Sequence, residues 1–459
     1  MNPAPDGSKP PTLTVGAQCL LEGAPAPLVA ALKRALTLPN PKYQAAKKYG
    51  RWIGKNFPQQ LFYFTETKEG LLMPRGFARE VVRYCREVLG VKPEIIDQRL
   101  TLPEVEFAFG GELRDYQEEA VRAVLTRDFG VLEAGTGSGK TVMALKVISL
   151  RRQPTLVLVH TKELMHQWAE RVADFLGIEA ALVGDGRCEL GPVTVAIVNS
   201  ARNQLELLTP RFGHLVVDEC HRVPATLFTE VVTGFPARYA LGLSATAYRR
   251  EDVLTRLIYL YMGSRSHQVD PQQLMDTGAV LRPRIELRNT GFSYNYRDDY
   301  PALMSALTTD EGRNRQIADD ALGVAAREPG AILIVSDRVA HCQRLAELIA
   351  ERGGGEAAVL TGRQSPERRA EIVAGLKSGT VKVLISTVQL IGEGFDAPGL
   401  STLFLATPIK FSGRLKQVIG RILRPAGGKR ATVYDYIDDQ VGVLQHSARE
   451  RQSTYWQLG

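Results

Sequence analysis

The sequence predicts an α/β protein in which two parallel-sheet domains follow one another and a smaller α+β domain precedes them. Two observations lead to this fold class. Strand-length runs recur between residues 113 and 459, and they are almost continuously apolar, which is typical of strands buried on both faces of a parallel sheet. Helix-like stretches separate most of these runs, as the crossover connections of a parallel sheet require.

Length and composition agree with a globular protein of several domains. With about 150 residues per domain, the 459 residues allow about three domains, and 44% hydrophobic with 23% charged residues excludes a disordered or fibrous chain. No apolar run is long enough to cross a membrane, and the opening MNPAPDGSKPP holds no apolar signal segment. Five cysteines without CxxC spacing predict neither a disulfide framework nor structural zinc, so we expect a cytoplasmic protein. The net charge of +7 suits a polyanionic partner.

Changes in composition along the chain predict four segments. Residues 1–11 are expected to be a loose Pro- and Gly-rich tail, and residues 12–108 an N-terminal accessory domain with a possible role in DNA recognition. The two parallel-sheet domains are expected at residues 109–281 and 282–459. Within the accessory domain, the MPRGF segment, Met73–Phe77, predicts a turn to which the sequence assigns no role.

The accessory domain carries a basic and aromatic strip. Between Gly23 and Thr65 the chain has no acidic residue but interleaves lysines and arginines with aromatic side chains. Such a strip can bind phosphates and stack on exposed bases. The alternative is that the aromatic residues form the core of this domain while the lysines are solvated. On the first interpretation the candidate nucleic-acid contacts are Lys47, Lys48, Arg51 and Trp52.

The elements of the two larger domains follow from the apolar runs. The spacing of Leu113, Tyr116, Ala120, Val121 and Val124 predicts a helix ahead of the first sheet. The strands expected in the first domain are Val131–Ala134, Thr155–Val159, Val193–Val198, Leu215–Asp218 and Ala240–Ser244. Those expected in the second domain are Ala331–Ser336, Ala357–Thr361, Lys382–Thr387, Thr402–Ala406 and Thr432–Tyr436.

One helix of the second domain has well-marked ends. Ser365, Pro366 and Glu367 supply a cap residue, a first-turn proline and a first-turn acid, and Gly379 marks the expected end of the helix.

A glycine-rich segment, AGTGSGKT, directly follows the first predicted strand of the first domain and precedes a helical stretch. A strand, a tight turn and a helix N-terminus in this order direct backbone N–H groups at phosphate. Lys140 can reach the β- and γ-phosphates, and the hydroxyl of Thr141 can bind Mg²⁺. Ala134 stands where the strict pattern has its first glycine, and the alternative interpretation is a glycine-rich surface turn. The predicted triphosphate site comprises Ala134, Gly135, Thr136, Gly137, Ser138, Gly139, Lys140 and Thr141.

An acidic pair ends the strand in HLVVDECH. Asp218 is placed to hold Mg²⁺ through water, and Glu219 is placed to orient or deprotonate the attacking water. Asp-Glu pairs are common by chance. The position of this pair downstream of the phosphate loop is therefore what supports its assignment to the nucleotide site.

These segments and several others resemble the motifs of superfamily 2 DEAD/DEAH-type helicases. DECH at Asp218–His221 resembles the DEAH-type box, and Ser244, Ala245 and Thr246 match the SAT motif that couples hydrolysis to movement. LRDYQ at Leu113–Gln117 resembles the adenine-recognition motif, and HTKELMHQW from His160 resembles motif Ia.

In the second domain, STVQLIGEGFDAP from Ser386 resembles motif V, and QVIGRILRP from Gln417 resembles motif VI. The likeness covers residues 112–438 with the motifs in the expected order.

The resemblance implies two tandem RecA-like domains, ATP and Mg²⁺ as cofactors, and a role for each matching residue. Gln117 would read the adenine edge with Arg114 beside it, and His221 would join the coupling motif. Arg421 and Arg424 would be arginine fingers that stabilise charge on the γ-phosphate, and Gln417, one helical turn earlier, would share their side of the helix. The remaining implied contacts are Gly394 and Asp396 at the nucleotide, and Thr161, Lys162 and Thr387 on the nucleic-acid backbone.

Within the superfamily, the chain is similar to the branch of XPB-like repair helicases, UvsW-like helicases and restriction-enzyme motor subunits. A RED triplet at Arg250–Asp252 supports this branch, although it stands one residue later than the XPB pattern. The resemblance implies an ATP-dependent DNA helicase or double-strand translocase, with 3′–5′ polarity, acting in repair, recombination or defence against foreign DNA. Its partner would be single-stranded, duplex or branched DNA, with a nuclease or repair protein as a further possibility and no membrane. An RNA helicase and an ATP-gated nucleic-acid clamp are the alternatives.

Overall fold

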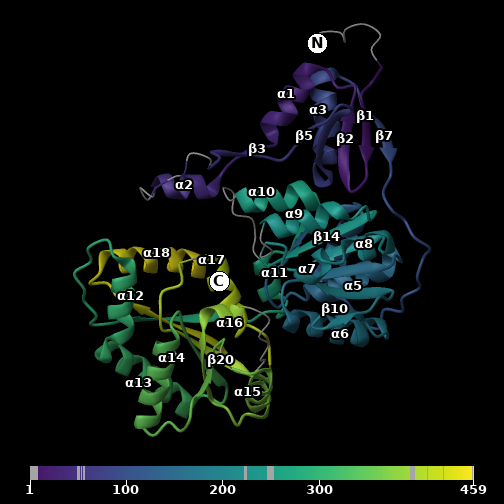
Figure 1. Ribbon diagram of the computed structural model, residues 1–459. Coiled ribbons are helices and arrows are strands. Elements are labelled where there is room, and N and C mark those ends of the chain that lie inside the picture. Colours follow the sequence, from purple (N-terminus) through teal and green to yellow (C-terminus); the bar gives the residue numbers. More distant parts are fainter. Residues whose placement is uncertain are drawn as a thin grey trace. The chain divides into compact units, whose positions relative to one another are not determined.

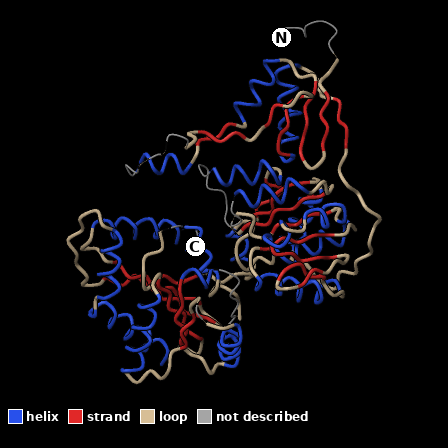
Figure 2. The backbone as a smooth tube through the Cα atoms, in the orientation of Figure 1, coloured by secondary structure: helices blue, strands red, loops and turns tan. Residues whose placement is uncertain are grey.

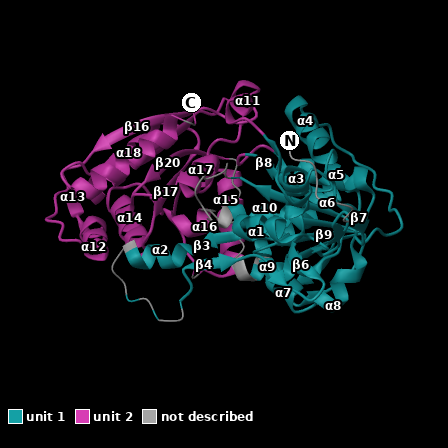
Figure 3. Cartoon of the chain, turned by 90° about the horizontal axis from the view of Figure 1, so that it is seen from above, with its two compact units in different colours: residues 1–134, 139–268 teal, residues 135–138, 269–459 magenta. Residues whose placement is uncertain are grey.

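The computed structural model describes residues 9–48, 52, 54, 57–221, 225–245, 253–362, 364–392, 399–410, 412–426, 428–456 and 458. The chain forms two compact units (Figure 3). The first comprises residues 1–134 and 139–268, and the second comprises residues 135–138 and 269–459. The finer domain boundaries after residues 108 and 281 stay a prediction.

The first unit begins with a small α+β region (Figures 1 and 2). Its sheet has the strand order β5-β6-β2-β1-β7, in which only β1 and β7 are parallel. Leu28, Leu32 and Val81 are fully buried, which places the apolar faces of two helices in the core of this region. The elements are β1 (Thr12–Val15), β2 (Gln18–Glu22), α1 (Ala26–Ala35), β5 (Thr65–Glu66), β6 (Gly70–Pro74), α3 (Ala78–Leu89) and β7 (Glu94–Asp97).

A two-stranded ribbon and a short helix extend from this region. Strands β3 (Thr37–Pro39) and β4 (Gln60–Phe62) pair antiparallel, and α2 (Pro41–Lys48) follows β3 in the chain. The basic and aromatic strip lies largely on this extension.

An eight-stranded sheet makes up the rest of the first unit. Its order is β11-β10-β12-β9-β13-β14-β8-β15, and all neighbours are parallel except β10 and β11. The strands are β8 (Phe129–Glu133), β9 (Thr155–Val159), β10 (Ala181–Gly184), β11 (Arg187–Cys188), β12 (Val193–Ile197), β13 (His214–Val217), β14 (Tyr239–Ser244) and β15 (Arg265–Gln268). The helices are α4 (Asp115–Leu125), α5 (Lys140–Arg151), α6 (Lys162–Leu176), α7 (Val198–Arg202), α8 (Leu205–Leu208), α9 (Ala225–Gly234) and α10 (Val253–Met262).

The second unit contains a six-stranded, fully parallel sheet in the order β16-β21-β20-β17-β19-β18. Its strands are β16 (Pro283–Asn289), β17 (Ala331–Ser336), β18 (Ala358–Leu360), β19 (Val383–Thr387), β20 (Leu400–Leu405) and β21 (Ala431–Ile437). Its helices are α11 (Pro271–Asp276), α12 (Tyr300–Thr309), α13 (Glu311–Arg327), α14 (Val339–Glu351), α15 (Pro366–Ser378), α16 (Val388–Gly392), α17 (Ser412–Gly420) and α18 (Gly442–Trp456). The predicted fold class, parallel sheets flanked by helices, is confirmed.

All ten strands expected in the two larger domains form, and their ends differ from the expected ones by at most two residues. The helix expected after Ser365 also forms: the Ser365 hydroxyl accepts the N–H of Arg368 at 3.3 Å, and Gly379 ends the helix with a left-handed φ of 77°. Four strands, β10, β11, β15 and β16, were not expected from the sequence. Strands β11, β15 and β16 lie at sheet edges and have polar or alternating sequences, and β10 has only four residues, so none shows a long continuous apolar run.

The MPRGF segment joins the two sheets of the first unit. It completes β6 and forms a 3₁₀ turn, η1 (Arg75–Phe77). Arg75 is 1% exposed, and its guanidinium donates to the carbonyl oxygens of Phe235 and Ala237, both at 2.9 Å. A Cβ on Gly76 would lie 2.4 Å from the backbone nitrogen of Gly263, so only glycine fits this close approach to the end of α10. The segment without an assigned role is therefore a structural joint.

Candidate functional site

The phosphate loop connects β8 to α5 as the sequence predicts. Gly137 and Gly139 have φ of 86° and 80°, in the left-handed region that favours glycine. The loop begins on the sheet, since the N–H of Ala134 donates to the carbonyl of Ser244 at 2.9 Å. The ammonium of Lys140 donates to the carbonyl of Ala134 at 3.0 Å. Thr141, half-buried, stands in the first turn of α5, whose free N–H groups and positive dipole end suit an anion.

The acidic pair lies at the same edge of the sheet. Strands β13, β14 and β8 are neighbours and parallel, so the residues that follow them come together at one edge. The carboxylate of Glu219 lies 3.8 Å from the ammonium of Lys140. Glu219 has φ of 45°, a left-handed conformation that costs a non-glycine residue energy and is often found at functional sites. The structure thus brings together Lys140, Asp218 and Glu219.

Asp218 is 6% exposed and is held by two donors. One carboxylate oxygen accepts the indole N–H of Trp168 at 2.8 Å, and the other accepts the backbone N–H of Glu219 at 2.8 Å. Burial, together with repulsion from the neighbouring Glu219 carboxylate, raises the pKa of Asp218 to about 6. A nearby divalent cation would favour the ionised form of such a group.

A polar contact joins the acidic box to the SAT strand. The Nδ1 atom of His221 lies 3.4 Å from the carboxylate of Glu219 and 3.1 Å from the hydroxyl of Ser244. Ser244 ends β14, and Ala245 follows it. Of the four residues predicted to couple hydrolysis to movement, His221 contacts the catalytic glutamate candidate and Ser244 contacts His221. Thr246 lies outside the described residues.

The candidate adenine-reading residue stands beside the phosphate loop. Gln117 is 7% exposed, and its side-chain oxygen accepts the backbone N–H of Arg114 at 3.0 Å. A Cβ on Gly139 would lie 2.4 Å from the amide nitrogen of Gln117, so the amide and the end of the loop are in close contact. The side chain of Arg114 is exposed. Of the two adenine-reading candidates, Gln117 is therefore the one that lies in close contact with the phosphate loop.

The candidate residues of motif VI belong to the second unit. Gln417 is 7% exposed within α17, and Arg421 follows the last helical residue, Gly420, in a turn closed by its own N–H on the carbonyl of Val418 at 3.1 Å. The guanidinium of Arg421 donates to the carbonyl of Ile391 at 3.0 Å. The expected helical continuity from Gln417 to Arg421 is thus cut by the end of α17. Arg424 is half-buried after the helix, and its approach to ATP with Arg421 stays a prediction.

Of the remaining nucleotide-site candidates, the structure describes those in the phosphate loop but not those of motif V. The crest of the phosphate loop, residues 135–138, is grouped with the second unit, and Ser138 is fully buried. Gly394 and Asp396 lie outside the described residues, as does the RED triplet.

The backbone-contact candidates have local structural roles. Thr161 caps α6 by accepting the N–H of Leu164 at 3.3 Å, and Lys162 forms an ion pair with Asp185. Thr387 ends β19 and is half-buried. Lys162 must leave or share Asp185 to bind a phosphate.

The basic and aromatic strip of the accessory region is exposed in part, whereas Tyr63 within it packs against the core. Lys47 is exposed on α2, and Trp52 and Phe62 are 89% and 61% exposed. The core of this region is instead made of aliphatic side chains such as Leu28 and Leu36. The alternative that the aromatic residues form the core therefore fails for Trp52 and Phe62. The side chain of Lys48 and the whole of Arg51 lie outside the described residues.

Two buried contacts near the site have no signature in the sequence. Trp168 supports Asp218 but sits at helical spacing with other buried residues of α6, which predicts only a core position. Glu133 directly precedes the loop, is 3% exposed, and accepts hydrogen bonds from the hydroxyl of Tyr259 and from Arg265, the latter at 3.3 Å. Among the described residues, no helix is long and apolar enough to cross a membrane, and no group of three His, Cys, Asp or Glu side chains is placed to hold a metal ion.

Known families and proteins match this arrangement. Residues 110–249 match the family described as type III restriction enzyme, res subunit, and residues 314–426 match the helicase conserved C-terminal domain. The DNA 3'-5' translocase XPB2 of Sulfurisphaera tokodaii is 26% identical over 409 residues, which cover 82% of this chain and 92% of that protein. The putative DNA 3'-5' helicase Rad25 of Halobacterium salinarum is 29% identical over 329 residues, which cover 68% of this chain and 52% of that protein.

A solved structure of S. cerevisiae Dbp5, bound to RNA and ADP BeF3, aligns with a TM-score of 0.55 and 16% identity. The alignment covers 75% of this chain and 87% of Dbp5. It shows that the two parallel-sheet regions have the RecA-like helicase fold.

Proposed function

Since the chain belongs to the superfamily 2 helicases, in the branch of XPB-like, UvsW-like and restriction-enzyme motor proteins, we propose that it couples ATP hydrolysis to translocation on DNA or to strand separation. The observation that carries this proposal is the cluster of Lys140, Asp218 and Glu219 at one sheet edge, next to a glycine loop with two left-handed residues. Loop, cation and carboxylates are the parts that phosphoryl transfer requires.

The residues present fit ATP with Mg²⁺. The N-terminus of α5 and the loop amides provide a cradle for phosphate, and the hydroxyl of Thr141 and the carboxylate of Asp218 are the hard oxygen ligands that Mg²⁺ prefers. When bound, Mg²⁺ neutralises charge on the phosphates. Lys140, held by Ala134 in the structure, would exchange that carbonyl for phosphate oxygens.

The other roles follow from position. Glu219 would hold the attacking water as a general base, and Gln117, next to Gly139, would bind the adenine edge. Arg421 and Arg424 would supply positive charge to the γ-phosphate from the second unit. His221, between Glu219 and Ser244, would report the state of the nucleotide to the SAT segment.

DNA as the substrate rests on the names of the two relatives, both described as acting on DNA in the 3'-5' sense. We propose the same polarity for this chain. We also propose that it acts in repair, recombination or defence against foreign DNA. Residues 12–108 would form the accessory domain, residues 109–281 and 282–459 the two motor domains. Exposed Lys47, Trp52 and Phe62 support a DNA-binding role for the accessory strip.

The test is the ATP hydrolysis rate of the purified protein on single-stranded DNA, duplex DNA, a branched junction and RNA. Lys140→Ala should abolish hydrolysis, while Lys146→Ala serves as the matched control, because Lys146 lies on the same helix but stacks on Phe109, at 4.8 Å from the ring centroid. Stimulation by DNA in the wild type and the control supports the proposal. Selective stimulation by RNA would contradict the DNA assignment.

A further inference from the structure

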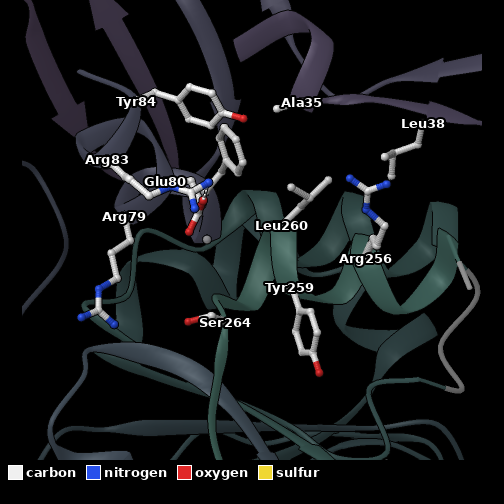
Figure 4. Close-up of a pocket in the computed structure, with 12 residues that line it drawn as sticks. Ala35, Leu38, Arg79, Glu80, Arg83, Tyr84, Arg256, Tyr259, Leu260 and Ser264 are labelled. Carbon is white, nitrogen blue, oxygen red and sulfur yellow. Dashed lines mark ion pairs between the residues drawn. The ribbon is translucent and has the colours of Figure 1, made fainter. Parts of the chain in front are cut away.

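A cavity of about 570 Å³ lies in the first unit between the accessory region and the first parallel-sheet region (Figure 4). Helix α3 provides one wall and α10 the opposite wall, with Ala35 and Leu38 bordering it near the ribbon. This volume is typical of a site for a drug-sized ligand, so it accommodates one or two nucleotides of a single strand but not a duplex.

The cavity is lined by three cations and one anion: Arg79, Arg83, Arg256 and Glu80. Arg83 forms an ion pair with Glu80 at 2.5 Å and approaches Glu87 at 3.7 Å, so Glu80 already has its partner. Within the part of the chain that the structure describes, neither Arg79 nor Arg256 forms an ion pair or a side-chain hydrogen bond, and both are exposed. The lining therefore carries two cations whose charge is available to a ligand.

The two available arginines stand apart. Figure 4 shows Arg79 at one end of the cavity and Arg256 at the other, on opposite walls. A single small anion would need converging cations, whereas an extended polyanion meets cations in series along its path. The spacing thus favours a chain of phosphates over an isolated phosphate.

The side chains between the arginines are apolar and aromatic. Phe77 and Tyr84 lie with ring centroids 6.4 Å apart. Phe77 and Leu260 are 7% and 8% exposed, whereas Tyr84 is half-buried, with the guanidinium of Arg83 at 5.4 Å from its ring centroid. Apolar and aromatic faces flanked by arginines are the features that bind unpaired bases without reading their sequence. Leu38 belongs to β3, which pairs with β4, and β4 carries the exposed Phe62 of the basic and aromatic strip opposite Thr37.

The walls are rigidly joined. Gly76, which also lines the cavity, leaves no room for a Cβ against the carbonyl oxygens of Leu260 and Tyr259, at 2.6 and 2.7 Å, and buried Arg75 bonds to Phe235 and Ala237. A ligand that binds in a cavity with fixed walls does not pay the entropy cost of ordering those walls.

We infer that this cavity holds one to two nucleotides of a single DNA strand, with Arg79 and Arg256 on successive parts of its backbone. The inference rests on the proposed function, and it identifies a contact on the accessory side of the first unit that no motor motif contains.

The experiment measures binding of a fluorescent oligothymidylate by anisotropy at several salt concentrations. The variant is Arg79→Glu with Arg256→Glu, and the matched control is Lys92→Glu with Arg211→Glu, which makes the same change in net charge at exposed positions of the first unit. We expect at least a tenfold loss of affinity for the variant and a salt slope smaller by about 1.4, because each lost phosphate contact on a single strand removes about 0.7 from the slope. The control should stay within about twofold of wild type at the same salt concentration and keep the wild-type slope.

Equal losses in the variant and the control would show that only overall charge matters, and an unchanged slope in the variant would show that the strand passes elsewhere. Either result overturns the inference. Crosslinking of a 5-iodouracil oligonucleotide provides the positional readout: a crosslink within α3 that disappears in the variant supports the site. The proposed function fails separately, if the wild-type protein neither binds DNA nor hydrolyses ATP in its presence.

Discussion

Gly76→Ala should destabilise the joint between the accessory region and the first parallel sheet. The added Cβ would lie 2.4 Å from the nitrogen of Gly263, 2.6 Å from the carbonyl oxygen of Leu260 and 2.7 Å from that of Tyr259. All three atoms are backbone, so no side-chain rotation relieves the overlap and either η1 or α10 must move. Overpacking of this kind costs about 1–3 kcal/mol in the free energy of unfolding.

The assay is thermal unfolding with hydrogen exchange measured by peptide. A loss of about 1–3 kcal/mol lowers the melting temperature of a unit of this size by roughly 2–4 °C per kcal/mol. Amide exchange should rise in η1 and at the end of α10, where the clash falls, before it rises in the sheet. Gly110→Ala is the control, because its Cβ would meet only the carbonyl oxygen of Phe175, at 3.9 Å. Equal stability of the two variants, with unchanged exchange at η1, would refute the close approach as the basis of the joint.

The remaining predictions concern the nucleotide site. Glu219→Gln should bind ATP but lower kcat about 10²–10⁴-fold, as expected for loss of a general base, and retained turnover would reassign that role. Arg421→Ala should lower kcat by about 10³-fold or more with little loss of ATP affinity, which full ATPase activity would contradict. The kcat/KM for ATP should fall as pH drops below about 6, because the raised pKa of Asp218 leaves its carboxyl neutral there. The profile of kcat at saturating Mg²⁺ should shift to lower pH, since the bound cation favours the carboxylate. Tyr259→Phe removes a donor to buried Glu133 and should cost about 1–3 kcal/mol in denaturant unfolding, so an unchanged midpoint would show that the bond contributes nothing.

The sequence predicted the parts of the site that depend on chain order and local geometry. Left-handed Gly137 and Gly139 follow from a tight turn that needs glycine, and the proximity of the loop to Asp218 follows from parallel strands whose carboxyl ends share one edge. The first inference needs only the local sequence of the loop, and the second needs only the knowledge that the strands are parallel.

Contacts between distant residues escaped prediction for a physical reason. Trp168 and Asp218 are 50 positions apart, and Glu133 and Tyr259 are 126 apart, so no periodicity links them. Their side chains occupy positions that a helix or strand pattern assigns to the core, and tertiary packing alone decides which core residue carries a polar partner. The same holds for Gly76, whose glycine is required by another helix and not by its own turn.

Helix α10 lies between the cavity beside the accessory region and the strand that precedes the phosphate loop. The backbone of Gly76 packs closely against the end of this helix. The helix also forms one wall of the cavity, to which it contributes Arg256 and Leu260. From the same helix the ring of Tyr259 points away from the cavity, toward the sheet, where its hydroxyl bonds Glu133 (Figure 4). Glu133 directly precedes Ala134, whose carbonyl holds Lys140. Helix α10 therefore contacts the accessory region at its end and, through the hydroxyl of Tyr259, the residue that directly precedes the phosphate loop.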